Sequence, residues 1–190
     1  MGFLDAILGR TKAPQADLDV LFAVPQATLS LEAAGFVPTG EGAVCFRDSD
    51  GVTDDKVVEE VQQVVATDPS ATARVRGDEH GVRWLHVTRP PGDVGALVSD
   101  LHVANSSLAD AGFGSKLLCS TVLLTTPSGG PAALVYLFKQ GTFYPFVPTS
   151  GQRRDNAAEL QLRGLVEGDV PVEPQLERWL ALWGAPGLTV

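Results

Sequence analysis

Apolar residues recur at two different spacings along the chain, and each spacing predicts a different kind of element. Val57 and Val61, with three further valines, return every three or four residues before Pro69, which is the spacing of one helix face. The same spacing follows Asp93, a favourable N-cap residue, and continues to Gly112, which can adopt the left-handed conformation that ends a helix. The sequence therefore predicts helices in both segments.

Other segments are rich in β-branched residues or almost continuously apolar, which predicts strands. "GAVCFRD" is one of them, and "TARVRG" and "VRWLHVTR" form a hairpin around "GDEHG". Three later segments, 117–125, 132–138 and 142–147, are joined by connections too short for a crossover. We therefore expect them to be antiparallel neighbours in one sheet. Pro145 has no N–H to donate, which predicts that the last of them lies at a sheet edge.

Two more helices are predicted after these strands. The first runs from about Asp155 to Glu167 and stops at Gly168, and the second begins at Pro174. The apolar face of the second helix would carry Leu176, Trp179, Leu180 and Trp183. Because hairpins dominate the order of elements, the fold class is α+β: a mainly antiparallel sheet of five to six strands packed against helices. We expect one such domain over residues 15–190.

An amphipathic helix and a linker are predicted ahead of this domain, in residues 1–14. "MGFLDAILGRTK" places Phe3, Leu4, Ile7 and Leu8 on one side of a short helix, and "KAPQ" follows as the linker. Two interpretations remain open. The helix packs on the domain, or it contacts a protein partner or a membrane interface.

The composition excludes several classes of function. The net charge is −9 and the pI is about 4.7, which argues against nucleic-acid binding and against adsorption of the whole body on an anionic membrane. No segment approaches the ~20 consecutive apolar residues that a membrane-spanning helix needs. The N-terminus also lacks the features of a signal peptide. We therefore expect a cytoplasmic protein.

Candidate catalytic and metal-binding residues are few. Cys45 and Cys119 are far apart in the sequence, and His80, His86 and His102 lack the spacing of a zinc motif. No serine stands in a nucleophile-elbow motif. We therefore predict no metal, no cofactor, no disulfide and no catalytic activity. The alternative is a small hydrolase that uses a site formed by His86, His102 and Cys119.

The segment "GTFYPFVPTSGQRRDN" predicts either an edge strand that enters a helix or a docking surface. Arg153 and Arg154 precede a predicted helix, whose positive N-terminal end disfavours cations, so they do not serve helix stability. Their guanidinium groups suit recognition of carboxylates or phosphates. Tyr144 lies among aromatic residues that alternate between the two sides of the strand. Tyr144, Arg153 and Arg154 are therefore the candidate docking residues here.

This segment, together with "MGFLDAILGRTK", "LVSDLHVANSSLADAGFGSKLLCS" and "WGAPGL", is similar to the PspAB family. These actinobacterial proteins are tied to the phage-shock (envelope-stress) response. The likeness covers most of the chain in order and is least distinctive around residues 50–88. It implies a cytosolic accessory of PspA, a membrane-remodelling protein. From the residues we predict a non-catalytic partner of PspA or of a related membrane-stress protein. We predict that the contact uses the N-terminal helix or the arginine pair, and that the helix makes any peripheral membrane contact.

Overall fold

The computed structural model describes residues 17–47, 52–77 and 81–190, so the predicted N-terminal helix and linker, residues 1–14, lie outside the described residues. The α-helices are α1 (Val24–Ala33), α2 (Val52–Val65), α3 (Val94–Leu108) and α4 (Asn156–Val166). Short helical turns are the 3₁₀ turn η1 (Leu18–Ala23), the π turn η2 (Ala109–Phe113) and the 3₁₀ turn η3 (Leu176–Arg178). The strands are β1 (Val37–Arg47), β2 (Thr72–Gly77), β3 (Val82–Thr88), β4 (Leu117–Thr125), β5 (Pro131–Leu137), β6 (Thr142–Phe146), β7 (Pro148–Thr149) and β8 (Arg153–Arg154).

Six strands form one antiparallel sheet in the order β2-β3-β1-β4-β5-β6. The predicted neighbours β4, β5 and β6 pair as expected, and β6 lies at a sheet edge. The hairpin of β2 and β3 is also confirmed. β7 and β8 form a separate two-stranded ribbon. Strands and helices segregate as the α+β class requires, which confirms the predicted fold class.

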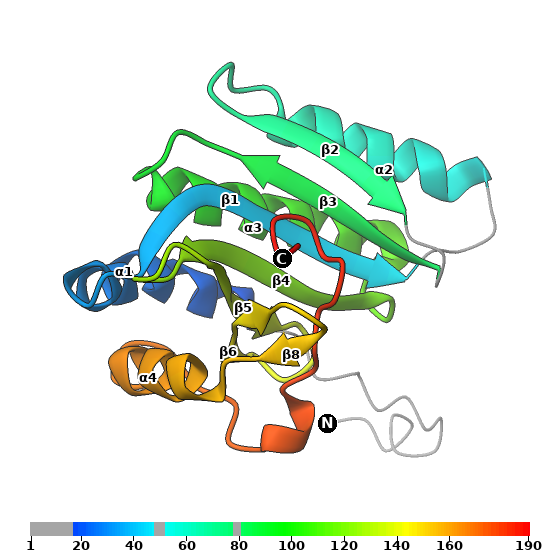
Figure 1. Ribbon diagram of the computed structural model, residues 1–190. Helices are drawn as coiled ribbons and strands as arrows, with labels where there is room; N and C mark the ends of the chain where they lie inside the picture. The colour runs from blue at the N-terminus through cyan, green and yellow to red at the C-terminus, as the bar shows by residue number, and fades with distance from the viewer. Residues whose placement is uncertain (1–16, 48–51, 78–80) are drawn as a thin grey trace, which may run out of the picture.

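Helices α1, α2 and α3 cover one face of the sheet (Figure 1). The predicted start of α3 is confirmed, because the Asp93 carboxylate accepts a hydrogen bond from the N–H of Ala96. Its predicted end is confirmed as well, since Gly112 has a φ of 96°. None of the described helices is long and apolar enough to cross a membrane. Large side chains of this buried core include Phe46, Leu85, Leu97, Leu101 and Tyr136.

The second face of the sheet is covered in part by the C-terminal segment, which runs across β4 and β1 without regular structure (Figure 1). The predicted final helix is therefore wrong, since only η3 forms. The carbonyl groups of Trp179 and Leu180 accept hydrogen bonds from the side chains of Arg154 and Tyr144, in place of bonds within a helix. Trp179 packs with Ala185 and Leu188 into the cluster on this face. Burial of apolar area against the sheet thus outweighs the local helical spacing.

Gly40 lies at the bend in β1, and this position leaves no room for a side chain. Gly40 has a φ of 80°, and a Cβ atom there would lie 2.4 Å from the carbonyl oxygen of Arg89. We expect Gly40→Ala to lower the free energy of unfolding by about 1–3 kcal/mol or more, because backbone must move. Gly164→Ala is the control: a Cβ there meets nothing within 4 Å, and the substitution in α4 should stabilise by about 0.5–1 kcal/mol. Urea unfolding of both variants checks this, and equal midpoints would contradict it.

Candidate partner-binding surfaces

The two predicted docking arginines point in different directions. Arg153 is exposed, and its Nε donates a hydrogen bond to the carbonyl oxygen of Ser150 at 3.2 Å. Arg154 turns inward: its Nε donates to Oε1 of Glu159 at 2.8 Å, and its Nη1 donates to the carbonyl oxygen of Trp179. The charge of Arg154 is thus paired within the chain, while its side chain stays partly exposed, and docking through it remains a prediction. Of the pair, Arg153 has the more exposed side chain.

Glu159 is the acidic centre of this contact. Its side chain is almost fully buried, and Oε1 also accepts a hydrogen bond from the N–H of Val147 at 3.0 Å. The guanidinium of Arg154 further lies 5.1 Å from the ring centre of Phe146. One arginine therefore joins the end of β6, the helix α4 and the C-terminal segment. A buried carboxylate that is paired and hydrogen-bonded in this way is a structural tie.

Tyr144 is covered by the same C-terminal segment. Its side chain is 1% exposed, its hydroxyl donates to the carbonyl oxygen of Leu180 at 2.9 Å, and its ring stacks on that of Trp179. Burial raises the pKa of the Tyr144 phenol above its usual range, and the neighbouring Cys119 adds to the shift. The prediction that this ring is available to a partner is corrected, because alternation along β6 placed it toward a second buried layer.

The remaining candidate residues, Phe3, Leu4, Ile7 and Leu8, lie outside the described part of the chain. The described chain begins at Asp17, whose carbonyl oxygen accepts a hydrogen bond from the hydroxyl of Tyr136 at 2.9 Å. Burial raises the pKa of Tyr136 to about 12. This contact holds the start of the domain against β5.

An apolar groove of about 290 Å³ lies between α4 and the C-terminal segment, and the sequence did not predict it. Leu160 and Leu176, each 56% exposed, line it together with the buried ring of Trp179. Leu160 belongs to the outer face of α4, and its place beside Leu176 depends on the irregular path of residues 174–190. Local spacing alone could not have indicated that path.

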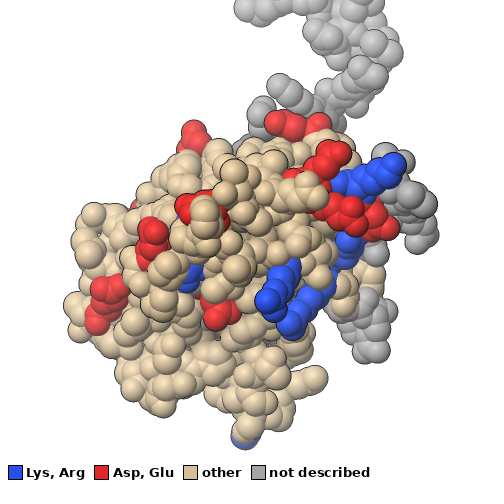
Figure 2. Space-filling model, turned by 90° about the horizontal axis from the view of Figure 1, so that it is seen from above, with Lys and Arg blue, Asp and Glu red and all other residues tan. Residues whose placement is uncertain are grey.

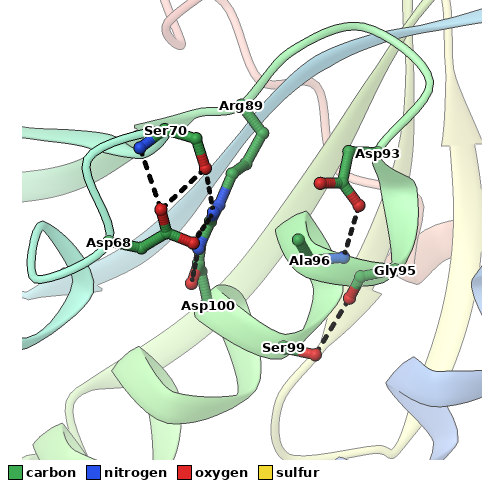
Figure 3. Close-up of polar contacts among 8 residues, drawn as sticks. All are labelled: Asp68, Ser70, Arg89, Asp93, Gly95, Ala96, Ser99 and Asp100. Atoms are coloured by element: carbon green, nitrogen blue, oxygen red, sulfur yellow. Dashed lines mark hydrogen bonds and ion pairs between the residues drawn. The ribbon is translucent and has the colours of Figure 1, made fainter.

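A buried arginine ties α3 to the α2–β2 connection at the end of β3 (Figure 3). Arg89 donates from Nε and Nη2 to the two carboxylate oxygens of Asp100 at 2.6 and 2.8 Å, and from Nη1 to Asp68 and to the Ser70 hydroxyl. Hydrogen bonding to Asp100 raises the pKa of Arg89 above its usual range. The hydrogen bond from Arg89 is the main cause that lowers the pKa of Asp68 to about 2. Every charged group in this cluster is paired, so the cluster holds α3 to the α2–β2 connection, and we call it the clamp.

The residues of the alternative hydrolase site do not converge. His86 lies on the second face of the sheet, where its Nε2 is 2.9 Å from Oε2 of Glu41, and Cys119 lies on that same face. His102 belongs to α3, on the opposite side of the sheet, and its Nε2 is 3.4 Å from Oδ1 of Asp19. Across the described ranges, no group of three His, Cys, Asp or Glu side chains could hold a metal ion.

The geometry of these surfaces does not identify a protein family, but comparison with protein-family models does. The family model described as PspAB, PspA associated protein B, matches residues 1–187. The chain belongs to the PspAB family. The match extends over all described elements and the predicted N-terminal helix, so the PspAB assignment applies to the whole fold and not to one motif. No curated protein and no solved structure matches the chain.

The buried pair of Arg89 and Asp100 predicts a large effect on stability. Arg89→Ala leaves a buried carboxylate without its cation, and we expect it to lower the free energy of unfolding by about 3–5 kcal/mol. Arg163→Ala, which removes an exposed ion pair with Glu167, should cost less than about 0.5 kcal/mol. Replacing both partners, Arg89→Met with Asp100→Leu, should recover much of the loss. Urea unfolding at pH 7 tests the three variants, and an equal loss in the Arg89 and Arg163 variants would contradict the clamp.

The lowered pKa of Asp68 predicts an acid-dependent contribution to stability. Because its pKa falls from 3.8 in the unfolded chain to about 2 in the folded one, the contribution is present above about pH 4. It disappears as the pH falls from about 4 to about 2. The difference in urea midpoint between the wild type and Asp68→Asn should therefore narrow over that window and stay constant from pH 5 to pH 7. A difference in urea midpoint that stays constant down to about pH 2 would contradict the pairing of Asp68 with Arg89.

Proposed function

We propose that this protein is a non-catalytic adaptor that associates with PspA, or with a related membrane-stress protein, in the bacterial phage-shock response to envelope stress. The observation that carries the proposal is the PspAB family match over residues 1–187. The separation of His102 from His86 and Cys119 by the sheet supports a binding role over the hydrolase alternative. A net charge of −9 supports a protein partner over a nucleic acid.

The proposal places the protein in the cytoplasm, where PspA would be reached directly or at the inner face of the cell membrane. The N-terminal helix, with Phe3, Leu4, Ile7 and Leu8 on one side, is the proposed peripheral contact. Full burial of such side chains is worth about 1.5–3 kcal/mol each. The net gain is smaller, because association also orders the segment.

We expect purified PspA to be retained by the tagged full-length protein at micromolar concentrations. Phe3→Ser with Ile7→Ser should weaken the retention, or the binding to vesicles of anionic lipid, by about tenfold or more, since two apolar contacts are lost. Leu29→Ser is the matched control, because Leu29 is 60% exposed on α1 and lies in the described domain. Its binding should equal that of the wild type.

The outcomes separate the two parts of the proposal. No retention of PspA by the folded wild-type protein would overturn the adaptor role itself. Retention that is unchanged in the Phe3 and Ile7 variant, with unchanged vesicle binding, would remove the N-terminal helix as the contact and leave the association in place.

A further inference from the structure

On the second face of the sheet, β2 and much of β3 lie beyond the C-terminal segment, which crosses the front of β4 and β1 (Figure 1). The strand register sets which side chains point to this front. Arg74 pairs with His86, which pairs with Ala43, and Arg76 pairs with Trp84, which pairs with Cys45. Because Ala43, Cys45 and Trp84 belong to the apolar cluster of the second face, Arg74 and Arg76 point to that same face.

Unlike most other cations of the described residues, these arginines have no acidic partner among those residues. Arg74 and Arg76 on β2, and Arg47 at the end of β1, are exposed, and no ion pair joins any of the three to a described carboxylate. By contrast, Arg89 and Arg154 are paired within the fold. Among the residues that the structure describes, no carboxylate thus pairs with these three guanidinium groups on one face of an acidic protein.

We call this surface the arginine face and define it by Arg47, Arg74, Arg76, Trp84 and His86. Trp84 is 8% exposed, so it forms an apolar floor beside the cations. A polar hollow of about 230 Å³ lies over Arg74, Arg76 and His86. Figure 2, which views the molecule from the side of β2, shows a run of basic side chains, with acidic side chains against one end of it and at several other places in the view.

One carboxylate belongs to the rim of this hollow. Glu41 lies beside it, with its Oε2 2.9 Å from Nε2 of His86, and no ion pair joins it to Arg74 or Arg76. Thr72 and Thr88 complete the lining with hydroxyl groups. The hollow therefore offers cations and hydroxyl donors to a ligand that carries carboxylates.

We propose that the arginine face docks an acidic segment of a protein partner, and this rests on the proposed function, in which that partner is PspA. Residues two apart on a strand are about 7 Å apart, so Arg74 and Arg76 can meet carboxylates on neighbouring turns of one helix, which are about 5–6 Å apart. Each guanidinium can hold a carboxylate with two parallel hydrogen bonds. The surrounding negative charge disfavours a membrane or a nucleic acid, which would bring many negative charges over the whole body.

The edge of β2 supports docking on the face over addition of a strand. The side chain of Gln62 on α2 donates from Nε2 to the carbonyl oxygen of Ala73 at 2.9 Å, which occupies an acceptor of the open edge. A partner strand would have to displace it. Side-chain contacts with the arginine face require no such displacement.

Charge reversal tests the arginine face directly. We expect Arg74→Glu with Arg76→Glu to weaken the binding of purified PspA at least tenfold in 50 mM salt. Wild-type binding should weaken as the salt rises to 300 mM, because the contacts are exposed. The control is Lys56→Glu with Lys139→Glu, which makes the same change in net charge at two other exposed cations. The control should stay within threefold of the wild type, and an equal loss in both variants, or none in either, would overturn the arginine face.

A second measurement separates failure of the arginine face from failure of the proposed function. Isotope-labelled full-length protein is titrated with a 15-residue peptide that carries glutamate at every fourth position, and separately with phosphatidylglycerol vesicles. We expect saturable amide shifts from the peptide confined to residues 72–77 and 82–88, absent in the Arg74 and Arg76 variant. This result would support the acidic-segment site even if PspA itself does not bind. No saturable shift with the peptide, or a response to vesicles alone, would overturn it.

Discussion

Both faces of the six-stranded sheet are apolar across β1, β4 and β5, and each must be covered for the chain to fold. Helices cover one face, while the C-terminal segment covers the other without being a helix or a strand. Side chains hold this segment: Tyr144 and Arg154 donate to its carbonyl groups, and the indole of Trp179 donates to the carbonyl oxygen of Glu173. The path of the last residues therefore follows from the need to cover the sheet, and it determines which surfaces remain open.

The cover is incomplete, and the uncovered strands have a different chemistry from the covered ones. Where the C-terminal segment lies over the sheet, the facing positions are apolar, such as Val135 and Phe146. Where it does not, β2 presents Arg74 and Arg76. Alternation along an edge strand with one exposed face explains the polar side chains. It does not explain why no carboxylate of the described residues pairs with them, and the proposed partner would supply such carboxylates.

Elements set by local spacing were predictable from the sequence. The hairpin of β2 and β3, the neighbours β4, β5 and β6, and the cap of α3 at Asp93 all depend on residues close together in the chain. The inward turn of Arg154 was not predictable, because its acceptor at Trp179 lies 25 residues away. The arginine face was missed for a related reason, since it depends on the sheet order that places β2 and β3 beside β1 and on where the C-terminal segment ends.

Hydrogen exchange of the full-length protein, with and without purified PspA, tests the account most directly, because it reports on every surface at once. We predict that PspA slows exchange in β2 and β3, residues 72–77 and 82–88, and leaves α4 and the C-terminal segment unchanged. Slower exchange confined to residues 153–190 would contradict the account, as would identical exchange with and without PspA.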